Sequence, residues 1–231
     1  MLKLKLAQNR QHVKCNQKTV LFASLEITPD DATKMIQRNH HVALAIDCSG
    51  SMDGEKLENA KESAISVVRR LSTSDLVSIV TFETEVEVKL NPTSASDPNI
   101  ENIIRSINVG GATALHGGIS TAFQLLQQAS VPNMISRLEV FSDGEPNVMP
   151  HDDDDFVQLA QAIRSNGVTL DVFGLGDDYN GPLLMQLSEL GGGKWEHVID
   201  TSDLTTIVNT QITEMQNTVI SNPQLQLTLM N

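Results

Sequence analysis

HVALAIDCSGSM, at residues 41–52, is the stretch from which the fold of this 231-residue chain follows. Its run Val42–Ile46 is short, apolar and rich in branched side chains, which is typical of a strand buried on both faces. The run ends at Asp47, and open α/β sheets bind ligands at the carboxyl ends of their strands. In the turn that follows, Asp47, Ser49 and Ser51 can direct three oxygens at one point, as a hard cation such as Mg²⁺ requires. Alone the pattern is weak evidence, because acids and serines are common in turns.

Two later stretches place further oxygen-bearing side chains beside core elements. GGAT, at residues 110–113, precedes an apolar helical run and puts the Thr113 hydroxyl in a loop at a helix start. LEVFSDG, at residues 138–144, reads as a second buried strand that ends in Asp143 and a glycine. Three loops therefore offer oxygen ligands at elements expected to lie in the core.

With these pieces in this order, the chain resembles the von Willebrand factor A domain family, whose metal-ion-dependent adhesion site is D-x-S-x-S, a distant Thr and a distant Asp. The resemblance covers about residues 42–215, and every position of the site is present: Asp47, Ser49, Ser51, Thr113 and Asp143. It implies that the two serines bind the metal directly. Thr113 and Asp143 would bind it directly or through water, and Asp47 often through water.

The same resemblance implies a function. The expected domain is not an enzyme, and its cation is Mg²⁺, with Mn²⁺ or Ca²⁺ as substitutes. Few anionic ligands leave that cation electrophilic, so its open position recruits an Asp or Glu carboxylate from a partner protein. The GGGKW stretch at residues 191–195, followed by a short strand, an Asp and a helix, resembles prokaryotic or stand-alone A domains more than integrin inserts.

The alternative is a Mg²⁺-dependent phosphoryl-transfer enzyme of the haloacid dehalogenase type, which also has a strand-end aspartate beside a metal. There, the nucleophilic aspartate is followed two residues later by a second acid that transfers protons. Here Ser49 stands at that position, and the chain contains no G-x-S-x-G, G-x-x-x-x-G-K-[ST] or G-x-G-x-x-G motif. We therefore favour the binding module.

Composition excludes other classes. With 29 acidic and 16 basic residues, the net charge of -13 argues against nucleic-acid binding, and aromatics at 3% leave little for base stacking. No segment is long and apolar enough to enter a membrane, and Met1–Leu6 lacks the apolar core of a signal peptide. Cys15 and Cys48 make no disulfide framework, and we interpret Cys48 as a small buried hydrophobic residue. A cytoplasmic location is expected.

Strands alternate with helices through most of the chain, which predicts a doubly wound, mainly parallel α/β sheet of Rossmann-like type. Residues 42–46 should form its central strand. A run of four aspartates at residues 152–155, after His151, could suggest calcium, but acids at a helix start complement the helix dipole, and we favour that interpretation. The further predicted strands are 76–82, 85–90, 137–141, 168–175 and 194–199; the predicted helices are 55–71, 100–107, 115–128, 156–165, 182–190 and 204–217.

The two ends of the chain lie outside the resemblance. Residues 2–6, 19–28 and 225–229 alternate apolar and polar side chains, and we expect them to pair into a small antiparallel β extension. The expected organisation is an N-terminal β extension and linker at 1–39, an A domain at 40–218 and a C-terminal strand at 219–231. Because the alternation is unfinished at Asn231, we expect the native protein to continue into a β-rich region.

Overall fold

The computed structural model describes residues 2–8, 20, 22–29, 38–131, 133–150, 152–176 and 180–198, together with residues 206, 207, 210, 213 and 214. These residues belong to two compact units, one within residues 1–37 and one within residues 38–216. No helix in the described part of the chain is long and apolar enough to cross a membrane. The domain boundaries expected from the sequence stay a prediction.

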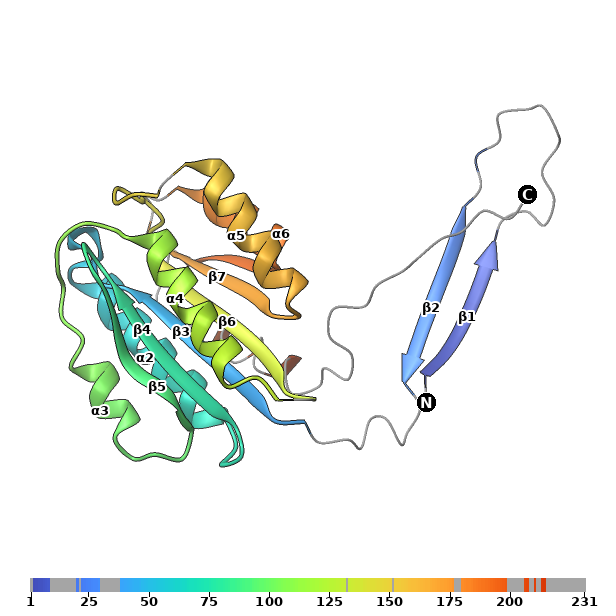
Figure 1. Ribbon diagram of the computed structural model, residues 1–231, viewed down its shortest axis with the longest axis horizontal. Coiled ribbons are helices and arrows are strands. Elements are labelled where there is room, and N and C mark those ends of the chain that lie inside the picture. The colour runs from blue at the N-terminus through green and yellow to red at the C-terminus, as the bar shows by residue number, and fades with distance from the viewer. Residues whose placement is uncertain are drawn as a thin grey trace. The chain divides into compact units, whose positions relative to one another are not determined.

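The larger unit is built on a six-stranded sheet, parallel except at one edge (Figure 1). The antiparallel edge strand β5 follows β4 as a hairpin, as its alternating sequence predicts. In spatial order the strands are β5 (Val86–Ser94), β4 (Leu76–Phe82), β3 (His40–Asp47), β6 (Ile135–Ser142), β7 (Thr169–Leu175) and β8 (Gly192–Val198).

Strand β3 lies in the middle of the sheet, and every one of its residues is buried. Because side chains alternate across a strand, Val42, Leu44 and Ile46 enter the core on one face while Ala43 and Ala45 enter the core on the other. The predicted central position of residues 42–46 is confirmed, and the carboxyl end of β3 lies between those of β4 and β6.

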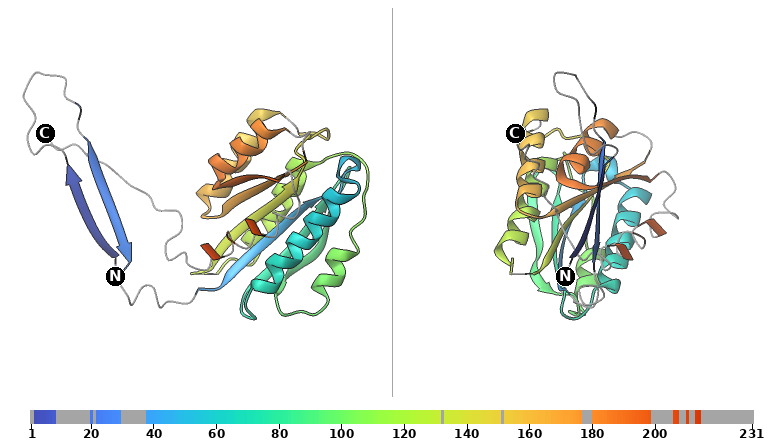
Figure 2. Two further views of the ribbon diagram at one scale, coloured as in Figure 1. Left: turned by 180° about the vertical axis from the view of Figure 1, so that it is seen from behind. Right: turned by 90° about the vertical axis from the view of Figure 1, so that its right-hand side faces the viewer.

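Helices cover both faces of the sheet. The face of Leu44 packs against α2 (Glu55–Arg70) and α3 (Ile100–Arg105), visible in the left view of Figure 2. The face of Ala43 packs against α4 (Leu115–Gln128), α5 (Asp153–Ser165) and α6 (Gly181–Gly191), and Figure 1 is seen from that side. The predicted doubly wound α/β architecture is confirmed.

Local sequence explains where these helices begin and end. Helix α5 carries Asp153, Asp154 and Asp155 in its first turn, where their charge complements the helix dipole. Helix α6 begins after Asn180, whose side chain accepts a hydrogen bond from the Leu183 N–H. Its C-cap is Gly192, which adopts the left-handed conformation at φ 73°. A short 3₁₀ helix, η1 (Gly50–Met52), was not predicted.

The smaller unit contains two antiparallel strands, β1 (Leu2–Gln8) and β2 (Ala23–Pro29). Leu4 is paired with Ile27 and Leu6 with Leu25, and these four side chains are exposed. The antiparallel extension is therefore confirmed for the first two segments. The predicted strand at residues 225–229 lies outside the described residues. So does most of the predicted helix at 204–217, of which the five described residues are helical.

Candidate metal centre

Asp47 ends the central strand and is held by two hydrogen bonds. Its side chain is completely buried. One carboxylate oxygen accepts from the Ser49 backbone N–H (2.9 Å), and the other accepts from the Ser142 hydroxyl (2.5 Å). Ser142 ends the neighbouring strand β6, so the second bond joins the carboxyl ends of two adjacent strands.

Burial, with a smaller contribution from the nearby Asp143 carboxylate, raises the pKa of Asp47 to about 6. The hydrogen bonds from Ser142 and Ser49 oppose this shift, because they stabilise the ionised form. Asp47 is therefore largely ionised at neutral pH.

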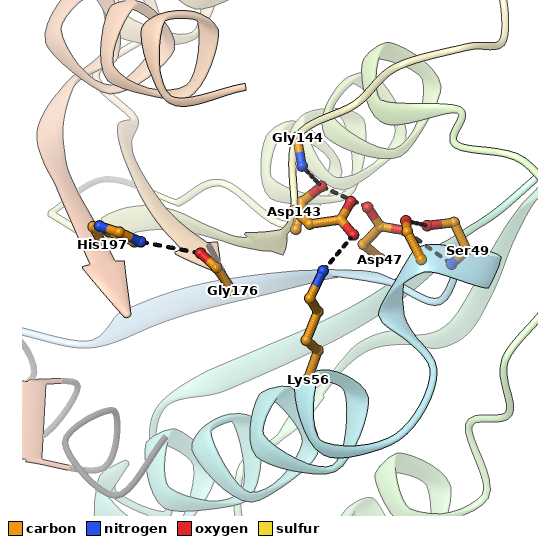
Figure 3. A network of polar contacts seen from close by, with 9 residues as sticks. Asp47, Ser49, Lys56, Asp143, Gly144, Gly176 and His197 are labelled. Atoms are coloured by element: carbon orange, nitrogen blue, oxygen red, sulfur yellow. Dashed lines mark hydrogen bonds and ion pairs between the residues drawn. The ribbon is translucent and has the colours of Figure 1, made fainter. Parts of the chain in front are cut away.

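The serines predicted as ligands lie in the turn immediately after Asp47. Ser49 precedes helix η1, and its hydroxyl lies 3.2 Å from the hydroxyl of Ser51. Ser49 is buried and Ser51 is exposed, so the turn reaches from the protein interior to its surface. Figure 3 shows Asp47 and Ser49 close to Asp143.

The loop that carries Thr113 is bonded directly to the serine turn. Gly50 N–H donates to the Gly111 carbonyl (2.8 Å), and Gly110 N–H donates to the Cys48 carbonyl (2.6 Å). Thr113 itself is buried just before α4. These backbone bonds hold the loop that carries Thr113 against the serine turn.

A second loop holds the backbone of Thr113 from the other side. The Asn147 side-chain carbonyl accepts a hydrogen bond from Thr113 N–H (2.7 Å), and Thr113 O accepts from the N–H groups of Asn147 and Val148. Asn147 belongs to the loop after Asp143. The loops of Thr113 and Asp143 are therefore also joined to each other.

Asp143 follows β6 and is 1% exposed. One of its oxygens, Oδ2, forms an ion pair with Lys56 Nζ at 3.2 Å (Figure 3). The other, Oδ1, is buried and has no hydrogen-bond partner among the described residues. A buried carboxylate oxygen without a partner is energetically costly, so this atom needs a donor or a cation.

Sequence reasoning missed three residues of this centre: Ser142, Asn147 and Lys56. Ser142 precedes Asp143, and strand alternation indicates that it faces away from that residue, but its bond to Asp47 depends on the β3–β6 register. Lys56 did carry a signal, because a basic residue in the first turn of a helix opposes the helix dipole.

The structure also places three residues that are close in sequence to the predicted ligands. Cys48 is buried and free, as predicted, and Glu145 is exposed on its loop. His116 is half-buried, and its ring packs edge-on against Phe156 at 5.6 Å between centroids. Within the described ranges, no three His, Cys, Asp or Glu residues gather as a metal site, so a metal here would depend on hydroxyl ligands.

Sequence comparison finds relatives of different kinds. A protein of Escherichia coli (strain K12), uncharacterized protein YfbK, is 27% identical over 214 residues, which are 91% of this chain and 37% of that protein. Human inter-alpha-trypsin inhibitor heavy chain H1 is 28% identical over 188 residues, covering 77% of this chain and 20% of that protein. The chain thus spans much less than half the length of either relative.

Solved structures share the fold. A von Willebrand factor type A protein from Catenulispora acidiphila matches with a TM-score of 0.75 at 20% identity, over 94% of this chain and 49% of the other. Proximal thread matrix protein 1 from the mussel byssus, with a zinc-occupied MIDAS motif, matches with a TM-score of 0.60 at 18% identity, over 77% and 47%. The family model for the von Willebrand factor type A domain matches residues 41–214. This chain belongs to the von Willebrand factor type A domain family.

Proposed function

We propose that the centre binds a divalent cation through Asp47, Ser49, Ser51, Thr113 and Asp143, and that the bound cation recruits an Asp or Glu carboxylate from a partner protein. Domains of this family are generally interaction modules, which is the class this function belongs to. The observation that carries the proposal is the Asp143 Oδ1 atom, which is buried and unpartnered beside a second buried carboxylate.

The chemistry of the donor set favours a hard cation. The candidate ligands are all oxygen, and only Asp47 and Asp143 carry formal charge. Mg²⁺ prefers oxygen and commonly keeps several waters, so one or two carboxylates suffice to hold it. With two negative charges against two positive ones, the bound cation would supply an electrophilic position for an incoming carboxylate.

Hydrogen bonds within the protein orient the candidate ligands before a metal binds. Ser142 and the Ser49 N–H hold the Asp47 carboxylate in one orientation, so little side-chain freedom remains to be lost on binding. The exposed Ser51 marks the solvent side of the centre, from which a partner would approach. A zinc-occupied MIDAS in the mussel protein supports a cation at this type of site, while the identity of the cation here is our proposal.

Calorimetric titration with Mg²⁺, Mn²⁺, Ca²⁺ and Zn²⁺ tests the metal. Asp47→Asn removes a ligand charge and should abolish binding or weaken it strongly. The matched control is Glu145→Gln, which removes one charge from an exposed residue of the adjoining loop. Equal affinities in wild type and Asp47→Asn would refute the site.

Short peptides with a single Asp or Glu test the second half of the proposal. We expect binding to the Mg²⁺-loaded protein, and loss of it both in EDTA and when the acid is replaced by Asn or Gln. Metal binding without any preference for the acidic peptides would leave a metal centre but exclude carboxylate recruitment.

Nothing in the geometry favours the phosphoryl-transfer alternative. Both oxygens of Asp47 accept hydrogen bonds, and Ser49 occupies the position where the second acid would stand. We expect no turnover of generic phosphate esters in Mg²⁺. Turnover that disappears in Asp47→Asn would favour the enzyme instead.

A further inference from the structure

Lys56 lies in the first turn of α2, where a positive charge opposes the helix dipole. The other charges at the two ends of this helix follow the usual pattern, with Glu55 and Glu58 in the first turn and Arg69 and Arg70 in the last. Lys56 therefore has an electrostatically unfavourable place on its own helix. A compensating interaction must come from outside α2.

That interaction is the ion pair with Asp143. Lys56 Nζ lies 3.2 Å from Asp143 Oδ2, with the Lys56 side chain 27% exposed and that of Asp143 1% exposed. The lysine thus reaches from a half-exposed position to a buried carboxylate of the candidate metal centre (Figure 3). Its ammonium brings a positive charge to a centre that otherwise offers hydroxyls and carboxylates.

The end of β7 leaves space for this side chain. Gly176 has φ 89°, and a Cβ atom there would come within 2.4 Å of Lys56 Cε and 3.1 Å of Nζ. The Gly176 carbonyl is itself fixed by a hydrogen bond with His197 Nε2 at 3.0 Å. A larger residue at this position would force Lys56 to move, so the glycine permits the lysine's path to Asp143.

We propose that Lys56 is a built-in counter-ion that competes with the divalent cation for Asp143. In the metal-free protein its ammonium offsets the repulsion between Asp47 and Asp143. When the metal binds, the same charge repels it and lowers its affinity. This inference rests on the proposed metal site and adds a residue that sets the affinity of that site.

Lys56 has two opposing effects on metal affinity, and the larger one decides whether its removal strengthens or weakens metal binding. The lysine helps to orient Asp143, but that residue is also fixed by its backbone, since its carbonyl accepts from Asn180 N–H (3.3 Å) at the end of a buried strand. A single charge within a few ångströms of a divalent ion is a stronger effect in a partly buried site. Removal of Lys56 should therefore tighten metal binding.

Calorimetry with Mg²⁺ and Mn²⁺ on wild type, Lys56→Met and Lys61→Met tests this. Met keeps the length of the side chain and removes its charge. Lys61 is the matched control because it lies on the same helix and pairs with Glu58 at 2.7 Å. We expect Lys56→Met to bind metal roughly tenfold tighter and Lys61→Met to change little. Equal or weaker binding by Lys56→Met would overturn the inference while the metal site stands; wild type that binds no metal would overturn both.

A thermal melt in EDTA tests the counter-ion role without metal. Lys56→Met should lower the melting temperature, and it should lower it much less in an Asp143→Asn background, because the partner charge is already absent. Equal shifts in the two backgrounds would show that the lysine acts through packing rather than through Asp143, and would overturn the counter-ion role.

Discussion

The sheet contains two pairs of buried carboxyl groups, and they are neutralised in different ways. Asp47 and Asp143 lie at its carboxyl edge, while Glu139 and Asp171 face each other in register on β6 and β7. The interior pair is served by Arg137, whose Nη1 lies 2.7 Å from Asp171 Oδ2. At the edge, the Asp47 carboxylate accepts hydrogen bonds from a hydroxyl and a backbone N–H, and Asp143 pairs with one lysine that reaches in from a half-exposed position.

Protonation distinguishes the two pairs. Burial and the neighbouring Asp171 raise the pKa of Glu139 to about 8, so at pH 7 it is mostly a neutral acid. Hydrogen bonds from Ser142 and Ser49 limit the rise for Asp47 to about 6, so it is mostly ionised. Burial also raises the pKa of Asp171, so the interior pair reduces its own negative charge beside one arginine. At the edge, Asp47 stays ionised next to the Asp143 carboxyl, and this arrangement favours a bound cation.

The largest expected effect on stability comes from removing Arg137. Arg137→Met would leave Asp171 buried without its ion-pair partner, which typically costs about 3–5 kcal/mol of unfolding free energy. Urea denaturation at pH 7 measures it. Arg69→Met is the control, because its pair with Glu101 is exposed and should contribute little. Similar losses for the two variants would contradict the assignment of a structural role to the interior pair.

The pH dependence of stability should come from Glu139. Its pKa is about 8 in the folded protein and near 4.5 when unfolded, so between these values the folded state binds more protons than the unfolded state. The unfolding free energy should therefore fall by a few kcal/mol as pH rises from about 5 to 8. Glu139→Gln, which imitates the neutral acid, should flatten this decline in urea titrations. Parallel profiles for variant and wild type would assign the decline to other groups.

The edge pair should respond to metal instead. At a free Mg²⁺ concentration a hundred times its Kd, binding should add about 2.7 kcal/mol to the unfolding free energy. Asp47→Asn should lose this gain, and Glu139→Gln should keep it in full. Denaturation in Mg²⁺ and in EDTA measures the difference. Loss of the gain in Glu139→Gln would mean that the two pairs are coupled, and the comparison would fail.

The smallest effect is expected for Asp143→Asn in EDTA. The substitution removes the ion pair with Lys56 and also the repulsion from Asp47, so the unfolding free energy should change by at most about 1 kcal/mol. The same denaturation experiment measures it. A loss as large as that of Arg137→Met would show that the edge pair is itself a structural element.

The central strand and the loops of the candidate ligands could be predicted from the sequence, because both depend on local patterns. The apolar run before Asp47 and the acid–glycine end of β6 predict their places without knowledge of the register. The interior pair could not be predicted, because Glu139 and Asp171 become neighbours only through the pairing of β6 with β7. Lys56 did carry a local signal in the first turn of α2, but its partner could not be identified because it lies 87 residues away.

Long sequence separation at the edge of the sheet also has a kinetic consequence. The bond from Ser142 to Asp47 spans 95 residues, so the two halves of the centre meet only after β3 and β6 have paired. Contacts of such span form late, because the intervening chain must first be ordered. A cation at this centre should therefore slow unfolding and leave the refolding rate nearly unchanged. In a stopped-flow chevron, Mg²⁺ would lower the unfolding limb alone, because the metal would stabilise the sheet only after it has formed.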